Sequence, residues 1–123
     1  MLIAIPIKED RGLDSETSPI FGRCPYFIFI DPETKAYRVE ENAAISAPGG
    51  AGIQAAQLVV DNHANAIISA DLGPKAHAVL SAAGITFFKF GGASVRDALE
   101  SFAQKQLPEL KKSSVDAHSG MQP

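Results

Sequence analysis

The sequence predicts a single α/β domain built on one mixed sheet. Two observations support this fold class. The first 41 residues contain three strand-like segments, two of which flank a turn, and from residue 52 to residue 102 helical and strand-like periods alternate. Such alternation is typical of a sheet with helices packed on its faces. The chain has 123 residues, of which 46% are hydrophobic, and this suits one domain with one core.

Three strands are expected in the N-terminal third. Residues 2–7 form a short apolar run that indicates a buried strand. Residues 26–30 are aromatic or β-branched throughout, which favours a strand. Residues 31–35 then form a turn with Pro32 at its second position, so residues 36–41 should return antiparallel as the second arm of a hairpin.

Helices and strands should alternate in the rest of the domain, each helix opening with a recognisable signal or an apolar face at helical spacing. The expected elements are a helix over 52–63, a strand over 66–69, a helix that starts at Pro74 and stops near Gly84, a strand over 85–88 and a helix with Ser94 as N-cap.

Short connections and right-handed crossovers turn this order into a topology. We predict a five-stranded mixed sheet of order 3-2-1-4-5, with only the second strand antiparallel, and three helices. This is the ribonuclease H-like arrangement. The domain should span residues 1–107, and residues 108–123 should form a flexible polar tail because they contain few apolar anchors.

Composition excludes several classes of function. The formal net charge of −3 argues against a nucleic-acid partner and against an anionic membrane surface. No apolar run reaches the roughly 18 residues of a membrane span, and residues 1–6 lack the basic start of a signal peptide. The single cysteine, Cys24, excludes an internal disulfide, so we expect a cytoplasmic protein.

The predicted topology brings four glycine-rich segments to one edge of the sheet. Ligand sites in open α/β sheets favour the carboxyl ends of parallel strands, and helix N-termini there attract anions. We therefore predict a binding site for an anion at this edge. Its candidate residues are Phe21, Gly22, Arg23 and Cys24, then Gly49, Gly50 and Gly52, then Gly73 and Lys75, and finally Gly91 and Gly92.

Two of the side chains near this edge are candidate metal ligands. Cys24 precedes the second strand, where Arg23 and helix ends should favour a partly accessible thiolate, and His77 falls about one turn into its helix. Each also has a simpler interpretation, because a lone cysteine is most often a buried apolar residue and glycines usually serve turn geometry. The sequence lacks a C-x-x-C pair, so any cluster must be assembled elsewhere and held as a whole.

These same residues resemble the dinitrogenase iron–molybdenum cofactor biosynthesis family. The likeness extends, in order, over about residues 1–110. It is carried by residues 3–6, 18–27, 49–57, 70–76 with 82–85, and 91–95 with 98–99. The resemblance agrees with a ribonuclease H-like fold and indicates a stand-alone member of the family.

The resemblance implies a function and a cargo. The family includes nitrogenase cofactor carriers and small domains, called orange proteins, that hold a molybdenum–copper sulfide cluster. It therefore implies a non-catalytic carrier or scaffold for an anionic, molybdenum-containing metal–sulfur cluster, of Mo–Cu–S or Fe–Mo–S type, with proteins that donate or accept the cluster as partners. Several cofactor carriers have histidine immediately before the Phe-Gly pair, but this chain has Ile20 there.

Two other classes of function stay open from the residues alone. One is a regulatory or interaction domain that binds a small anion or a partner protein. The other is a nuclease, which ribonuclease H-like folds host by placing carboxylates on the first strand. Residues 2–7 contain no acidic residue, so an enzyme is not expected.

Overall fold

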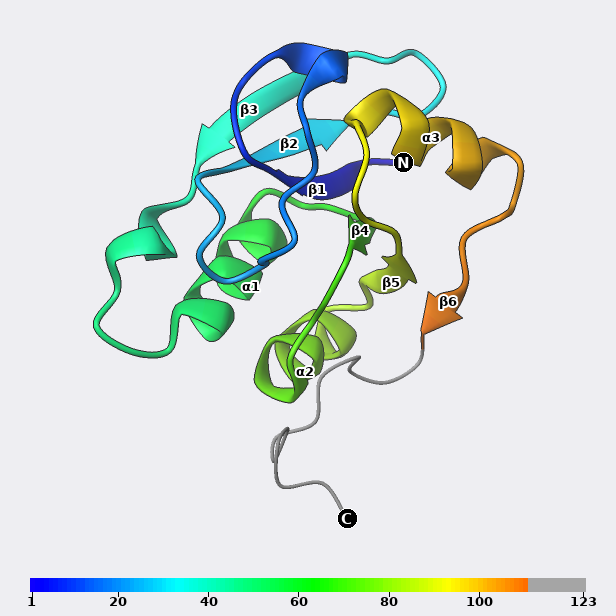
Figure 1. Cartoon of the computed structure of the whole chain (residues 1–123). Helices are drawn as coiled ribbons and strands as arrows, with labels where there is room; N and C mark the ends of the chain where they lie inside the picture. Colours follow the sequence, from blue (N-terminus) through cyan, green and yellow to red (C-terminus); the bar gives the residue numbers. More distant parts are fainter. Residues whose placement is uncertain (111–123) are drawn as a thin grey trace.

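The computed structural model describes residues 1–110 and has six strands in one mixed sheet with the order β3-β2-β1-β4-β5-β6 (Figure 1). The strands are β1 (Ile3–Ile7), β2 (Tyr26–Ile30), β3 (Tyr37–Glu41), β4 (Ala66–Ser69), β5 (Thr86–Lys89) and β6 (Glu109–Leu110). The helices are α1 (Ala51–Asp61), α2 (Pro74–Ala82) and α3 (Val95–Ala103), with 3-10 turns η1 (Gly12–Asp14) and η2 (Ala43–Ser46). The predicted order of the first five strands and the three helices are confirmed.

Strand directions follow the expected pattern except at one edge. β1 pairs antiparallel with β2 and parallel with β4, and β4 pairs parallel with β5. The prediction of five strands is wrong, because Glu109 and Leu110 form β6, which pairs antiparallel with β5. The fold therefore runs past the predicted boundary at residue 107. Residues 111–123, the rest of the predicted tail, lie outside the described residues.

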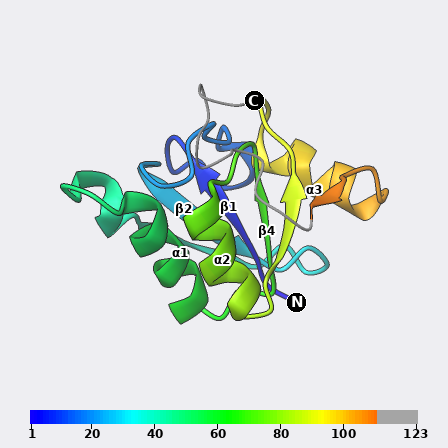
Figure 2. The same cartoon turned by 90° about the horizontal axis from the view of Figure 1, so that it is seen from below.

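Alternation along the strands gives the sheet two apolar faces. Ala4, Phe27 and Ile67 belong to one cluster of buried side chains, whereas Ile5 and Ile28 belong to the other. This is the period of two that strands impose on their side chains. α1 and α2 cover the first face and α3 covers the second, as the view from below shows (Figure 2).

β3 is the exposed edge of the sheet. Its register with β2 pairs Tyr37 with Ile30 and Glu41 with Tyr26. Tyr37 is half exposed, and the guanidinium of Arg38 lies 5.1 Å from the centre of the Phe29 ring. Among residues 1–110, no helix is long and apolar enough to cross a membrane.

Candidate functional site

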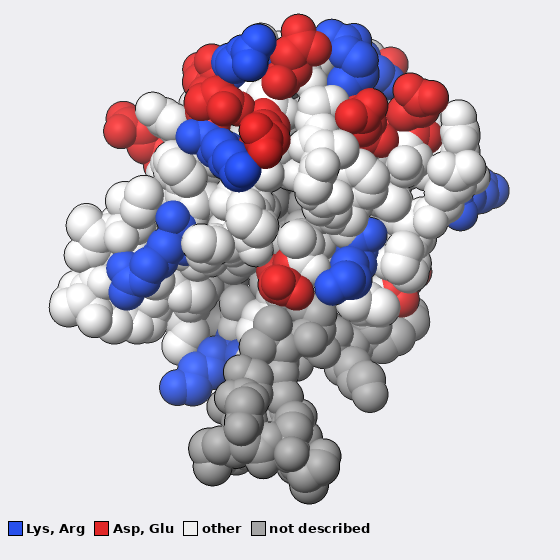
Figure 3. All heavy atoms as spheres, viewed as in Figure 1, with Lys and Arg blue, Asp and Glu red and all other residues white. Residues whose placement is uncertain are grey.

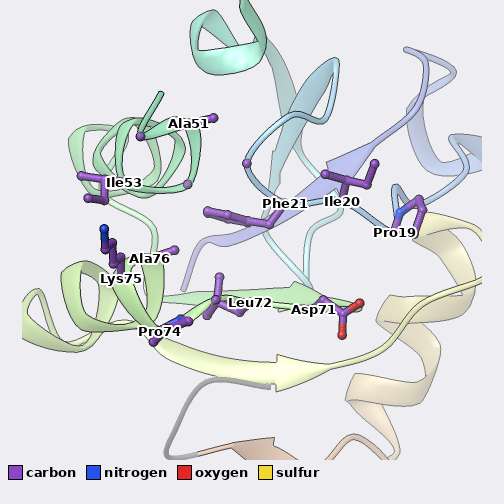
Figure 4. A pocket seen from close by; sticks show the side chains of 14 residues that line it. Pro19, Ile20, Phe21, Ala51, Ile53, Asp71, Leu72, Pro74, Lys75 and Ala76 are labelled. Atoms are coloured by element: carbon purple, nitrogen blue, oxygen red, sulfur yellow. The ribbon is translucent and has the colours of Figure 1, made fainter. Parts of the chain in front are cut away.

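A groove of about 620 Å³ opens where α1 and α2 begin, beyond the carboxyl end of β4. This volume is within the range of roughly 300–1,000 Å³ that is typical of small-molecule sites. Two loops and the first turns of two helices line it: Pro19, Ile20, Phe21, Gly22, Gly50, Ala51, Gly52, Ile53, Asp71, Leu72, Gly73, Pro74, Lys75 and Ala76 (Figure 4).

Both helices start at the groove without a side-chain cap. The N-cap of α1 is Gly50 and that of α2 is Gly73, so neither offers a side-chain oxygen to the first amides. Neither helix has an acidic residue in its first turn. Five first-turn amides, those of Ala51, Gly52, Ile53, Lys75 and Ala76, find no acceptor among the described residues. Together with the positive ends of two helix dipoles, they form a site for negative charge.

The first turns of α1 and α2 are close enough to act on one ligand. A Cβ atom added to Gly52 would lie 3.8 Å from the Cβ of Ala76, which is ordinary van der Waals contact between the two helices. Gly22 approaches α1 even more closely, because a Cβ there would lie only 2.9 Å from the amide nitrogen of Gly52. Only glycine at position 22 lets the loop lie against the amides of α1.

Apolar side chains form the rest of the groove. Phe21 is buried and packs edge-on against Phe27, with 5.3 Å between ring centres, and Leu72 lies below it (Figure 4). Ile20 and Ile53 stay largely exposed, at 56% and 40%, on opposite sides of the groove. A ligand therefore meets amide donors on one side and an apolar wall on the other.

The charges around the groove are unequal. Lys75 lines it and forms no salt bridge with a described residue. Asp71 also lines it, but its carboxylate lies 3.5 Å from the ammonium of Lys89 and is thereby partly offset. Elsewhere, acidic and basic side chains crowd together over the loop between β1 and β2 and over α3, where Lys8–Glu16 and Asp14–Arg96 pair (Figure 3).

The structure separates the residues that were predicted for this site into two groups. Six of them line the groove: Phe21, Gly22, Gly50, Gly52, Gly73 and Lys75. Six others, including both candidate metal ligands, do not: Arg23, Cys24, Gly49, His77, Gly91 and Gly92. Gly91 instead packs against the chain after β4, because a Cβ there would lie 2.6 Å from the Cβ of Ala70.

Cys24 corrects an explicit expectation. It was predicted to be a partly accessible thiolate, but its side chain is fully buried in the core under α1 and α2. Burial raises the pKa of the Cys24 thiol to about 12, although hydrogen bonds from Asn42 and the backbone act in the opposite direction. Since the thiolate is the form that binds metal, Cys24 in this conformation is a packing residue. The sequence prediction placed it at the correct edge but at the wrong depth.

His77 and Arg23 also lie elsewhere than expected. The His77 ring points toward β5: it lies edge-on to Phe87, and its Nδ1 is 3.2 Å from the hydroxyl of Ser81. The guanidinium of Arg23 donates to the carbonyl oxygens of Ile45 and Ala47, both at 2.9 Å. Arg23 thus holds two loops together instead of contacting the groove.

Sequence reasoning missed one residue behind the groove and eight that line it: Pro19, Ile20, Ala51, Ile53, Asp71, Leu72, Pro74 and Ala76. Pro19, Ile20 and Leu72 were not predicted because apolar residues in loops give no periodic signal. Asn42 was missed too, although asparagine before a short turn is a common capping signal. Its side chain accepts from the amide of Ala44 and donates to carbonyl oxygens of the loop that contains Gly22.

The groove suits an anion that is bound without metal–protein bonds. Within residues 1–110, no group of three or more histidine, cysteine, aspartate or glutamate side chains is placed to hold a metal ion. The available donors are amides and one ammonium group beside aromatic and aliphatic carbon. Such a surface can hold an anion through hydrogen bonds and charge.

Comparison with known proteins agrees with this geometry. The model of the dinitrogenase iron-molybdenum cofactor family matches residues 1–105. An uncharacterized protein of Methanocaldococcus jannaschii is 32% identical over 114 residues, which cover 90% of this chain and 92% of that protein.

Two proteins of known structure share both fold and sequence. The apo form of the orange protein from Desulfovibrio gigas superposes with a TM-score of 0.87 at 34% identity, over 92% of this chain and 95% of that one. A NifB-like protein from Thermotoga gives a TM-score of 0.78 at 32% identity, over 92% of this chain and 96% of that one.

Proposed function

This chain belongs to the dinitrogenase iron–molybdenum cofactor family, and we propose that it is a non-catalytic carrier or scaffold for an anionic metal–sulfur cluster. The cluster is its cargo, held in the groove where α1 and α2 begin. One observation carries this proposal. Two helices start at the same groove without a side-chain cap, so their first-turn amides and two positive dipole ends gather at one site.

The identity of the cargo is the finer part of the proposal. The likeness to an orange protein supports a molybdenum–copper sulfide cluster, and the family supports an iron–molybdenum one. Ile20 lines the groove at the position where cofactor carriers have histidine, so it offers no imidazole to a metal. This difference favours a cluster held by hydrogen bonds and apolar contact, as expected for a Mo–Cu–S species.

The absence of a catalytic set supports a carrier over a nuclease. Every residue of β1 is apolar, so this strand offers no carboxylate for paired metals. Asp71, the single acidic residue that lines the groove within residues 1–110, lies beside Lys89. The ribonuclease H-like description therefore concerns architecture in this proposal and implies no hydrolysis.

A regulatory domain that binds a small oxyanion is the second candidate. The same uncapped amides would accept phosphate or molybdate, and they alone do not distinguish oxygen from sulfur. The exposed side chains of Ile20 and Ile53 favour the sulfide, because a strongly hydrated oxyanion gains little from apolar contact.

The proposal is tested by titration without oxygen. Wild-type protein is titrated with a preformed molybdenum–copper sulfide cluster, with molybdate and with phosphate, at low and moderate salt. We expect cluster binding to be the tightest of the three and to weaken with salt, because Lys75 and the helix ends act partly through long-range attraction. Phosphate or molybdate binding as tightly as the cluster would favour the regulatory candidate.

A neutral variant of Lys75 sharpens the experiment. Lys75→Met keeps most of the side chain and removes the charge, and Lys105→Met is the matched control because Lys105 lies outside the groove. We expect Lys75→Met to weaken cluster binding about threefold to tenfold at low salt, with a smaller difference at moderate salt. Equal affinity of both variants and wild type would contradict the placement of the cargo.

A further inference from the structure

Asn42 and Arg23 do not line the groove, but they hold in place the loop that forms its apolar wall. Asn42 is 1% exposed, and its amide nitrogen donates to the carbonyl oxygens of Gly22 at 3.0 Å and Cys24 at 2.8 Å. Its amide oxygen accepts from the amide of Ala44 at 3.1 Å. The buried side chain thus joins the loop before β2 to η2, the turn that follows β3.

Arg23 makes a second connection between the same two segments. Its two terminal guanidinium nitrogens donate to the carbonyl oxygens of Ile45 and Ala47, each at 2.9 Å. Ile45 belongs to η2, and Ala47 follows η2 directly. The planar fork of arginine can reach two carbonyl oxygens at once, which the single ammonium of lysine does less well. Asn42 acts from the buried side of the loop and Arg23 acts from the exposed side.

One of these hydrogen bonds is made to Gly22, a residue that lines the groove. The carbonyl that Asn42 binds belongs to Gly22, whose Cα faces the amide nitrogen and Cα of Gly52 so closely that a Cβ would lie 2.9 and 3.1 Å from them. Phe21, the aromatic wall, is the adjacent residue. The separation between the apolar wall and the amides of α1 therefore depends on Asn42 and Arg23.

We propose that Asn42 and Arg23 are positioning residues that fix the width of the groove and thereby select a ligand large enough to touch both of its sides. The contacts are independent of the proposed function, but their effect on binding rests on it. A multi-metal sulfide cluster can meet the amides and Phe21 together, whereas a single tetrathiomolybdate ion need contact only the helix ends. Loss of either connection should therefore weaken cluster binding more than tetrathiomolybdate binding.

The test uses Arg23→Lys as the main variant, because it keeps the charge and Arg23 is exposed. The matched control is Arg38→Lys, since Arg38 also donates to a loop carbonyl, that of Asn62 at 3.3 Å, but lies away from the groove. Affinities for the preformed molybdenum–copper sulfide cluster and for tetrathiomolybdate are measured for each protein. We expect the ratio of the two affinities to fall about threefold to tenfold in Arg23→Lys and to stay at the wild-type value in Arg38→Lys.

A second measurement needs no ligand. Proton–proton contacts between the Gly22 methylene and the Gly52 amide are recorded by nuclear magnetic resonance in wild type, Arg23→Lys and Asn42→Ser. We expect the contact to weaken in both variants while the contacts between β1 and β4 persist. If the Gly22–Gly52 contact is retained in both variants and the ratio of the two affinities is unchanged, Asn42 and Arg23 do not position the wall of the groove. If wild type binds neither ligand, the proposed function fails, and the Gly22–Gly52 contact alone decides the positioning role.

Discussion

The N-termini of α1 and α2 differ from that of α3 in the way their first amides are satisfied. α3 begins with a capping box: the Ser94 hydroxyl accepts from the amide of Asp97, and the Asp97 carboxylate accepts from the amide of Ser94. α1 and α2 begin at Gly50 and Gly73 with no such partner. One helix is completed by its own side chains, whereas the other two leave donors and positive charge for something outside the chain.

This difference separates stability from binding within one small domain. Glycine at an N-cap costs a helix only roughly a few tenths of a kcal/mol relative to a side-chain cap, so Gly50 and Gly73 leave the first amides open at the groove with little loss of stability. The lack of side-chain caps is specific to α1 and α2, because α3, which does not begin at the groove, is capped by Ser94. The pattern is typical of a site whose ligand supplies the missing acceptors.

The largest effect should come from giving α2 the cap that it lacks. Gly73 has extended backbone angles and open space around its Cα, so aspartate fits there as an N-cap. We expect Gly73→Asp to stabilise the fold by roughly a few tenths of a kcal/mol and to weaken cluster binding about 100-fold, because a carboxylate then occupies the amides and repels the anion. Thermal unfolding and cluster titration of the same samples measure both effects.

Gly73→Ser serves as the uncharged control for that variant. Serine can cap the same amides without charge, so its loss of affinity should be smaller than that of aspartate. Unchanged cluster affinity in both variants would show that the N-terminus of α2 is not part of the binding site.

Cys24 should contribute to stability and not to binding. Cys24→Ala leaves a small cavity beneath α1 and should lower the free energy of unfolding by about 1–2 kcal/mol, while cluster affinity stays at the wild-type value. Native Cys24 should also react with iodoacetamide far more slowly than the unfolded chain at pH 8, because its thiol is buried and neutral. A protein that loses its cluster on this substitution would contradict the packing role.

The raised pKa of Cys24 predicts a dependence on pH. Its ordinary value is 9.0 and its folded value is about 12, so the unfolded chain gives up the proton first. The contribution of the protonated thiol to the free energy of unfolding is fully present below pH 9 and is lost as pH rises toward 12. The free energy of unfolding of wild type, measured with urea, should therefore fall more steeply between pH 9 and pH 12 than that of Cys24→Ala. The variant serves as the reference for all other titrating groups.

The smallest effect should come from removing the cap that α3 possesses. Ser94→Ala should lower the free energy of unfolding by about 1 kcal/mol and leave cluster affinity unchanged, because Ser94 lies outside the groove. Urea unfolding and the same cluster titration measure the two quantities. A clear loss of cluster affinity would mean that the N-terminus of α3 is coupled to the groove.

The sequence predicts the elements of this fold well because most of them carry a strong periodic signal. Tyr26–Ile30 and Ala66–Ser69 were expected at the bounds that the structure has, and Ser94 was recognised as a cap. β6 was missed because two residues are too few to show a period. Its place depends on pairing with β5, which is a long-range contact.

The groove lies at the sheet edge where the sequence predicted a site, but its details were not predictable. The predicted topology brought Gly50 and Gly73 to one edge, and the structure shows that they are the N-caps of α1 and α2 and provide no side-chain cap. The burial of the Cys24 side chain could not be predicted, because it depends on how η2 and α1 pack over it. Nor could the partners of Arg23, because a sequence shows a charge but does not show which carbonyl groups it will meet.

The exposed edge strand has a consequence for the behaviour of the protein in concentrated solution. The outer side of an edge strand has unpaired backbone N–H and C=O groups on which further chains can add, and this is a common route to aggregates. β3 presents Arg38, Glu40 and Glu41 along that edge, with Arg38 and Glu40 3.7 Å apart. An incoming strand would have to desolvate these charges, so we expect the domain to resist strand addition and to stay dispersed at high concentration.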